Sequence, residues 1–237
     1  MQEFAAEMER LDDCEMILAY VYAFASQRGV TAFSYHCFPP FETANSKNTY
    51  VHAMGFSLRW QSAYIGERLI LSDPIPDLTF ANPPILTWEK AMTLSEGDPV
   101  ATQFFTRLRQ EGLENGVSFS LYGPKARYGY ASMIFDKATQ DLPGGLIALL
   151  HGVMQSAHLR IAQITAAKEE TTSDLSEREL EVLRWMAQGK SASDIATILA
   201  ISPDTVKTYV KRLYEKLQVG DRVAAAVKGL RLGLIDF

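Results

Sequence analysis

The C-terminal part of the chain, Asp174–Phe237, carries the capping residues of four short helices in close succession. A capping box, Ser176-x-x-Glu179, begins the first helix, because each of its two side chains can accept a hydrogen bond from the other residue's backbone N–H. Gly189 ends that helix. The second helix starts at Ser191, the third begins with the N-cap serine and proline of Ser202-Pro203, and the fourth follows Gly220-Asp221. Caps at this spacing exclude long helices and strands, and they predict a small four-helix domain.

The third of these helices, which follows Ser202-Pro203, has two different faces. Apolar residues recur along it at spacings of three and four and form one buried stripe: Val206, Val210, Leu213 and Leu217. The opposite face carries cations and a hydroxyl, which can contact phosphates and base edges: Lys207, Thr208, Lys211 and Arg212. A short helix, a turn and such a third helix are the order of a helix-turn-helix unit. A plain helical bundle with a solvated charged face is the alternative.

The placement of charge agrees with DNA binding, although the whole chain is acidic with a net charge of −5. From Asp174 onward there are 10 Lys and Arg against 9 Asp and Glu, a net of +1; the preceding residues have 13 against 19, a net of −6. A nearly neutral domain needs two copies to make enough contacts, so we expect a homodimer on two-fold symmetric double-stranded DNA. The expected contacts come from Lys207 and Lys211, supported at phosphates by Thr205, Thr208 and Arg212.

The residues before this domain show a mixed pattern. We expect helices over residues 8–28, 58–67, 100–111 and 144–167, and strands over residues 31–38, 49–56, 117–122 and 128–136. This order predicts an α+β protein, with an N-terminal α/β/α sandwich around a central antiparallel sheet and a C-terminal four-helix helix-turn-helix domain. The polar run 168–174 is the expected linker between domains 1–167 and 175–237.

Two helices are expected to join copies of the chain. The helix over residues 144–167 has more apolar residues than one packed face needs, which predicts contact with a second subunit. The fourth helix of the C-terminal domain is expected to pair the two DNA-binding domains.

The sequence also argues against several classes of protein. Cys14 and Cys37 fit no metal-ligand spacing, and we expect reduced thiols in a cytoplasmic protein. No apolar run is long enough to cross a bilayer, so no membrane partner is expected. No nucleophile elbow, phosphate loop or metal-ligand motif is present. We therefore expect no enzymatic activity, no metal and no cofactor.

Aromatic residues stand out in the N-terminal half. Trp60 and Tyr64 are four residues apart and project from one face of a helix, and Asp73-Pro74, Trp88 and Gly116 follow. Packing in the core is the ordinary explanation for such aromatic residues. Asp73 differs, because a buried carboxylate needs a hydrogen-bond donor, and a ligand can supply one.

Both halves resemble one family. Residues 175–235 are similar to the DNA-binding domain of the LuxR-type transcription regulators, through the segments LSERE at 175–179, ISP at 201–203, TVK at 205–207 and LGL at 232–234. The set Trp60, Tyr64, Asp73-Pro74, Trp88 and Gly116 resembles, in its spacings, the ligand-binding domain of the same regulators, which detect N-acyl homoserine lactones. The resemblance covers nearly the whole chain and implies a ligand-responsive, dimeric transcription regulator of quorum sensing.

The resemblance also implies roles for individual residues. Trp60 would donate its indole N–H to the lactone carbonyl, Asp73 would accept the ligand amide N–H, and Ser132 would lie near the amide carbonyl. The remaining pocket wall would come from Tyr64 and Trp88, with Tyr35 and Met133, and also Phe33 and Met54, as neighbours.

Phe56 departs from the family pattern. Many relatives have a tyrosine four residues before the tryptophan, and its hydroxyl helps to hold the amide carbonyl. We expect Ser132 or a water molecule to make that contact here, with a loss of about 1 kcal/mol.

Three alternatives remain open at this stage. The chain could be an orphan regulator that needs no lactone or binds another small molecule, and Phe56 motivates that hypothesis. It could be a phosphorelay response regulator, which can share this DNA-binding domain, although Asp12-Asp13 lies within a helical pattern. It could also be an enzyme that acts on lactones. Acyl length, operator sequence and the sign of regulation do not follow from the sequence.

Overall fold

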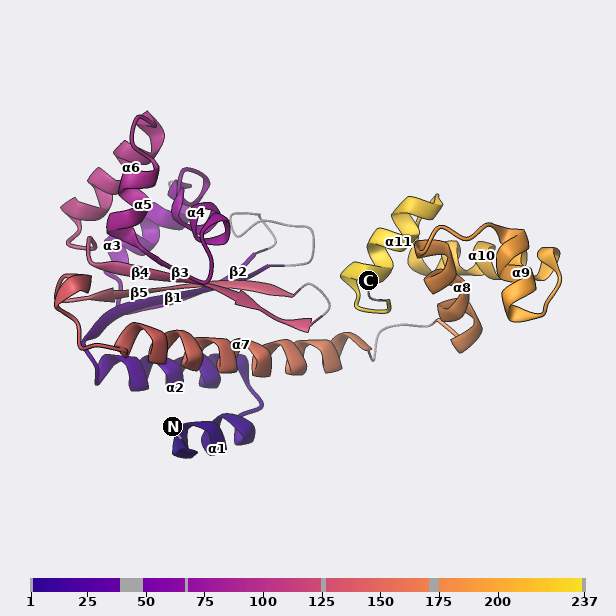
Figure 1. Ribbon diagram of the computed structural model, residues 1–237, viewed down its shortest axis with the longest axis horizontal. Coiled ribbons are helices and arrows are strands. Elements are labelled where there is room, and N and C mark those ends of the chain that lie inside the picture. The colour runs from indigo at the N-terminus through magenta and orange to yellow at the C-terminus, as the bar shows by residue number, and fades with distance from the viewer. Residues whose placement is uncertain (1, 39–48, 67, 125–126, 171–174, 236–237) are drawn as a thin grey trace. The chain divides into compact units, whose positions relative to one another are not determined.

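The structure is a computed structural model that describes residues 2–38, 49–66, 68–124, 127–170 and 175–235 (Figure 1). The chain divides into two compact units, Met1–Ile164 and Thr165–Phe237. The N-terminal unit is built on one five-stranded antiparallel sheet in the order β2-β1-β5-β4-β3. The strands are β1 (Val30–Phe38), β2 (Tyr50–Met54), β3 (Ile85–Thr87), β4 (Gly116–Tyr122) and β5 (Tyr128–Phe135).

Helices cover both faces of this sheet, as Figure 1 shows. Helices α2 (Cys14–Ser26) and α7 (Leu146–Glu170) lie along one face, and α1 (Gln2–Arg10) packs beside α2 through Phe4. The other face is covered by α3 (Leu58–Gln61), α4 (Ile75–Ala81), α5 (Trp88–Leu94) and α6 (Pro99–Gln110). This confirms the predicted α/β/α sandwich with a central antiparallel sheet.

The sheet separates two hydrophobic cores, because successive residues of a strand point to opposite faces. On β1, Phe33 and Tyr35 belong to the core with α2 and α7. The alternate residues Ser34 and His36 face the helices on the other side, where Trp60 and Trp88 form the second core. The central strands are therefore buried on both faces, and their polar residues gather on only one of them.

The first predicted helix, over residues 8–28, is in fact two helices. Asp13 ends the continuous pattern because its carboxylate accepts hydrogen bonds from the backbone N–H groups of Glu15 and Met16, at 2.9 and 3.0 Å, and so caps the start of α2. Asp13 fits the helical pattern of the sequence, but its short side chain favours the cap position.

The segment 58–67 also differs from one regular helix. After α3 the chain continues as a π-helical turn over Ser62–Gly66. The sequence pattern did not reveal α4, α5 or β3, each of which is too short to show a hydrophobic period. Helix α7 continues to Glu170, past residue 167, where the domain was expected to end. The rest of the expected linker, 171–174, lies outside the described residues.

The C-terminal unit contains α8 (Glu177–Ala187), α9 (Ala192–Leu199), α10 (Pro203–Leu217) and α11 (Arg222–Arg231). The capping box at Ser176 and Glu179 is formed, and Ser202 caps α10, as predicted. Ser191 and Asp221 cap α9 and α11. The buried carboxylate of Glu179 also accepts a 2.7 Å bond from Lys216 Nζ, which joins α8 to α10. The predicted four-helix helix-turn-helix fold is confirmed. None of the helices within the described ranges has the length and apolar character needed to span a membrane.

Candidate functional site

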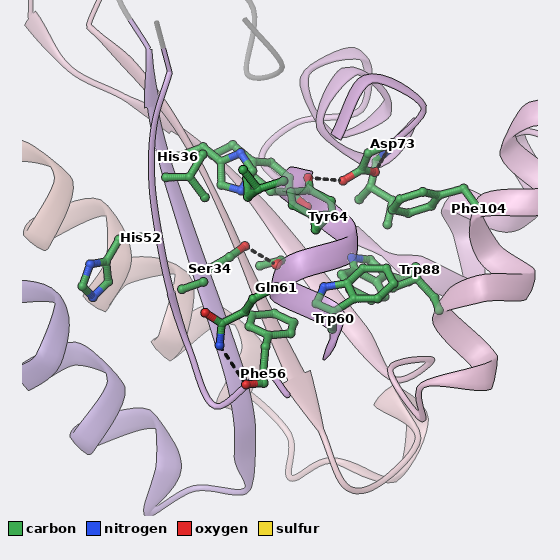
Figure 2. A pocket seen from close by; sticks show the side chains of 17 residues that line it. Ser34, His36, His52, Phe56, Trp60, Gln61, Tyr64, Asp73, Trp88 and Phe104 are labelled. Atoms are coloured by element: carbon green, nitrogen blue, oxygen red, sulfur yellow. Dashed lines mark hydrogen bonds between the residues drawn. The ribbon is translucent and has the colours of Figure 1, made fainter. Parts of the chain in front are cut away.

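A cavity of about 350 Å³ lies in the N-terminal unit between the sheet and the helices of the second core. Its floor comes from β1 and β5, and its walls come from the helical side (Figure 2). Six residues singled out in the sequence line it: Phe56, Trp60, Tyr64, Asp73, Trp88 and Ser132. The structure thus brings together side chains from segments that are up to 76 positions apart in the sequence, from Phe56 to Ser132.

Asp73 is a buried carboxylate at the edge of this cavity, just before α4. Its Oδ2 accepts a 2.7 Å hydrogen bond from the Tyr64 hydroxyl, and its Oδ1 accepts a 2.9 Å bond from the Ile75 N–H. Burial raises the pKa of Asp73 from 3.8 to about 7, although both hydrogen bonds act to lower it. A charged donor or a further N–H donor would stabilise the ionised form, so this carboxylate is suited to accept a hydrogen bond from a ligand.

Trp60 supplies a donor to the same cavity. Its backbone N–H is held by the Ser57 hydroxyl at the start of α3, and its ring packs against Tyr64 and Phe104 with centroids 5.8 and 6.2 Å apart. The indole N–H makes no hydrogen bond to any residue in the described part of the chain. Because a buried donor normally has a partner, this N–H is available to a ligand in the cavity.

Trp88 is fixed instead by protein contacts. Its indole N–H donates to Ser118 Oγ at 2.7 Å, and its ring lies directly against Gly116. A Cβ at position 116 would lie 2.1 Å from Trp88 Cδ2, so only glycine leaves room for the ring. The spacing between Trp88 and Gly116 therefore reflects a packing contact that sets one wall of the cavity.

The floor of the cavity is polar. Ser34 and Ser132 are register partners on β1 and β5, and their hydroxyls are 2.8 Å apart. Tyr130 lies two residues before Ser132 on the same face of β5 and shares a 3.0 Å hydrogen bond with Ser118. A cavity with aromatic walls and hydroxyls along its floor suits a ligand that has both an apolar part and hydrogen-bonding groups.

In the C-terminal unit, the outer face of α10 carries the side chains expected to contact DNA. Lys207, Thr208, Lys211 and Arg212 are exposed, whereas Val206 and Leu213 are buried on the opposite face. Thr205 is half-buried, and its hydroxyl bonds Ser202 Oγ at 2.8 Å in the N-terminal cap. Lys207 pairs with Asp204 at 3.0 Å on the surface. The described residues contain no group of acidic, histidine or cysteine side chains that could hold a metal ion.

Comparison with known proteins identifies both units. Residues 14–161 match the family described as the autoinducer binding domain, and residues 173–228 match the bacterial regulatory proteins of the luxR family. The chain is also 31% identical, over 235 residues, to the quorum sensing-dependent transcriptional regulator RpaR of Rhodopseudomonas palustris, a match that covers 98% of this chain and 93% of RpaR. The chain belongs to the LuxR family.

Solved structures of LuxR-family proteins share its fold. SdiA of Escherichia coli superimposes with a TM-score of 0.75 at 22% identity, over 99% of this chain and 97% of that one. A second SdiA structure, in complex with octanoyl-rac-glycerol, gives a TM-score of 0.71 over 100% and 95% of the two chains, also at 22% identity. CepR2 of Burkholderia cenocepacia, described as N-acylhomoserine lactone dependent, gives a TM-score of 0.50 at 16% identity over 70% of this chain and 91% of CepR2.

The predicted resemblance to LuxR-type quorum-sensing regulators is thus confirmed. The match over residues 14–161 also removes the response-regulator alternative, because the N-terminal unit is an autoinducer-binding domain instead. The relatives are transcription regulators, in agreement with the prediction that the chain is not an enzyme.

Three expected neighbours of the ligand, Phe33, Tyr35 and Met133, lie elsewhere in this LuxR-family chain. Tyr35 and Met133 are fully buried on the opposite face of the sheet, in the core with α2 and α7. There the Tyr35 hydroxyl is 2.8 Å from His158 Nδ1 on α7. Phe33 lies in the same core. The expectation that these side chains line the cavity was wrong, because Ser34 and Ser132 face it and adjacent strand residues must face away.

Several cavity residues were not predicted from the sequence. Ser34, His36 and Tyr130 line the floor, while Gln61 and Phe104 line the walls. The alternation along residues 33–36 contained the signal for Ser34 and His36, since it separates polar from aromatic positions there. The aromatic set was assigned to the ligand, whereas the polar set is the one that faces the cavity. No local pattern pointed to Gln61 or Phe104.

Proposed function

We propose that this regulator binds an N-acyl homoserine lactone in the cavity of the N-terminal unit, and a palindromic promoter site as a homodimer. The observation that carries this proposal is that a buried acceptor and a buried donor, Asp73 and the Trp60 indole N–H, line one cavity. A homoserine lactone amide carries the complementary pair, an N–H donor and carbonyl acceptors.

In the proposed complex, Asp73 accepts the amide N–H and Trp60 donates to the lactone carbonyl. Tyr64 keeps its hydrogen bond to Asp73 and forms the wall beside it, and Trp88 forms another part of the wall. The acyl group adds burial worth about 0.8 kcal/mol per methylene. Ser132 on the floor of the cavity lies near the amide carbonyl of the ligand. The Phe56 side chain provides only apolar surface.

Ligand binding would activate the regulator by stabilising the folded state of the N-terminal unit. A ligand that binds only the folded state stabilises it by about 4 kcal/mol at a concentration of one thousand times Kd. The stabilised regulator would dimerise and place two α10 helices at half-sites about one turn of DNA apart. Exposed apolar residues support this arrangement: Leu159 on α7, which is 40% exposed, and Val223 and Val227 on α11, which are 71% and 38% exposed.

On DNA, we assign Lys207 and Lys211 to base or phosphate contacts and Thr208 and Arg212 to phosphates, because all four are exposed on α10. Thr205 acts beside them from the first turn of the helix.

The decisive experiment is mass spectrometry of small molecules extracted from the full chain after production with a mixture of lactones. The parent should retain a lactone, and Asp73→Ala should lose it. Equal recovery from both proteins would remove Asp73 from the site. No lactone in the parent would refute the proposed ligand.

An acyl glycerol is the second candidate, because a SdiA structure with this fold contains octanoyl-rac-glycerol. Such a ligand has hydroxyl donors for Asp73 but no amide. Recovery of an acyl glycerol at full occupancy from protein produced without lactones would favour acyl glycerols as the ligand class. A ligand-independent orphan regulator would yield neither a lactone nor an acyl glycerol.

A further inference from the structure

Three serines form one row across the face of the sheet on which the cavity lies. Ser34 on β1 and Ser118 on β4 are both register partners of Ser132 on β5. All three are buried, with 8%, 0% and 3% of their surface exposed for Ser34, Ser118 and Ser132. Tyr130, 2% exposed, lies beside this row on the same face of β5. The large majority of buried hydroxyl groups are hydrogen-bonded, and this rule gives a direction to the bonds between them.

The assignment starts at Trp88, whose indole N–H can only donate. It donates to Ser118 Oγ at 2.7 Å, and Ser118 shares one further bond, of 3.0 Å, with the Tyr130 hydroxyl. If Tyr130 were the donor, the Ser118 hydrogen would be buried without an acceptor among the described residues, which is unfavourable. Ser118 is therefore the donor, and the hydrogen of the Tyr130 hydroxyl is left to point elsewhere.

A second hydrogen remains at the serine pair. Ser34 and Ser132 use one of their two hydroxyl hydrogens in the 2.8 Å bond between them. Ser34, Ser132 and Tyr130 all line the cavity, so two donor hydrogens face it. Tyr130 and Ser132 are two residues apart on β5 and face the same cavity, so both donors can reach one acceptor. A carbonyl oxygen has two lone pairs and can accept both.

The geometry of the ligand amide identifies the ligand oxygen that accepts these two hydrogen bonds. In a planar trans amide the N–H and the C=O point in opposite directions. A ligand amide that gives its N–H to Asp73, on the helical side of the cavity, therefore turns its carbonyl toward the sheet. The hydroxyls of Tyr130 and the serine pair lie there.

We propose that Tyr130 is a ligand-binding residue whose hydroxyl, oriented by Trp88 through Ser118, donates together with the Ser34–Ser132 pair to the acyl carbonyl oxygen of the lactone. This inference rests on the proposed function. It supplies, from the sheet, the hydroxyl that Phe56 lacks on the helical side. Ser118 does not line the cavity, and it acts as a positioning residue for Tyr130.

The test is Tyr130→Phe in the full chain, which removes one oxygen and keeps the ring. Affinity is measured by calorimetry for a panel of N-acyl-L-homoserine lactones with linear, 3-oxo, 3-hydroxy and aromatic acyl groups. For the tightest lactone, Kd should rise about fivefold to tenfold, the loss expected for one hydrogen bond. The matched control is Tyr128→Phe on the same strand, where the side chain is 41% exposed and Kd should not change.

A change in the ligand tests the contact without relying on a variant. The thioamide analogue of the tightest lactone keeps the N–H and replaces the acyl oxygen by sulfur, a weaker acceptor. The parent should bind the thioamide more weakly than the amide, and Tyr130→Phe should lose a large part of that discrimination. Ser118→Ala should weaken binding in the parent but have no further effect in the Tyr130→Phe background, because it acts through Tyr130.

The outcomes separate the two proposals. If the parent binds a lactone and Tyr130→Phe binds it equally well, with unchanged discrimination against the thioamide, the role of Tyr130 is refuted while the proposed function stands. If the parent binds no lactone in the panel, the proposed function itself fails. A lower affinity with unchanged discrimination would show that Tyr130 only supports the fold, and would also overturn this inference.

Discussion

Replacing Asp73 by asparagine should stabilise the empty protein above neutral pH and weaken its binding of lactone. The two effects have opposite signs because the ionised carboxylate is costly in the empty cavity and favourable against a ligand donor. Burial raises the pKa of Asp73 from 3.8 to about 7. One pKa unit corresponds to about 1.4 kcal/mol, so ionising this buried group costs the folded state about 4 kcal/mol.

The sign follows from linkage. A group whose pKa is raised in the folded state contributes stability that is fully present below its unfolded pKa and is lost as the pH rises through its folded pKa. The free energy of unfolding of the empty parent should therefore fall between about pH 4 and pH 8 as Asp73 ionises. Asparagine cannot ionise, and its amide can still accept from the Ile75 N–H and donate to the Tyr64 oxygen. At pH 8 the variant should be more stable by about 3 kcal/mol, after about 1 kcal/mol is subtracted for poorer hydrogen bonding.

The assay is urea unfolding of the full chain at several pH values and one protomer concentration. Trp60 and Trp88 report on the N-terminal unit, so both proteins carry Trp185→Phe to remove the signal from α8. Lactone titrations of the same proteins should show Kd raised about tenfold to one hundredfold by Asp73→Asn, as for the loss of a hydrogen bond to a charged group.

Asp77→Asn is the matched control, since Asp77 is exposed in the first turn of the same helix. Its charge is the smallest of the causes that shift the pKa of Asp73, so Asp77→Asn should bring only a small gain in stability at pH 8 and little change in lactone affinity. An Asp73→Asn protein that is less stable than the parent at pH 8, or that binds lactone as tightly, would refute the reasoning.

Four further outcomes are expected. The Kd for lactone should rise about tenfold from pH 8 to pH 6 in the parent as Asp73 takes up a proton, and it should be independent of pH in Asp73→Asn, as calorimetry can show. Gly116→Ala should lower the melting temperature and the lactone affinity, because its Cβ would lie 2.1 Å from Trp88; a melting temperature equal to the parent's would contradict this. The double variant Val223→Glu, Val227→Glu should weaken DNA binding about tenfold, because the added charges separate the two α11 helices of the dimer. Lys228→Glu is the control for added charge, and sedimentation measures how much dimer remains. Lys211→Ala should weaken DNA binding and reduce the slope of log K against log salt by about 1 per protomer, and an unchanged slope would exclude a phosphate contact.

The helices of the C-terminal unit could be predicted because their signals are local. Ser176, Ser191, Ser202 and Asp221 each cap a helix by accepting a bond from the backbone N–H three residues further on. Such contacts depend on a few neighbouring residues, and tertiary structure does not need to be known. The four long strands of the N-terminal unit were equally accessible through their alternation.

The cavity was accessible only in part. Trp60, Tyr64, Asp73, Trp88 and Ser132 were found through their resemblance to family positions, whereas the side of the sheet that faces the ligand was assigned wrongly. A strand that is buried on both faces shows no contrast between core and solvent. Aromatic residues then suggest a binding site as readily as a packed core, and the helices that cover each face decide between them.

The peptide bond between Ser34 and Tyr35 joins two sites on opposite sides of the sheet. Ser34 faces the cavity, and Tyr35 extends the other way to His158 in the middle of α7. A bound ligand that shifts the backbone of β1 at Ser34 must also shift Tyr35, because the two residues are adjacent. Strand β1 therefore couples the cavity to α7, the helix that we expect to contact the second subunit.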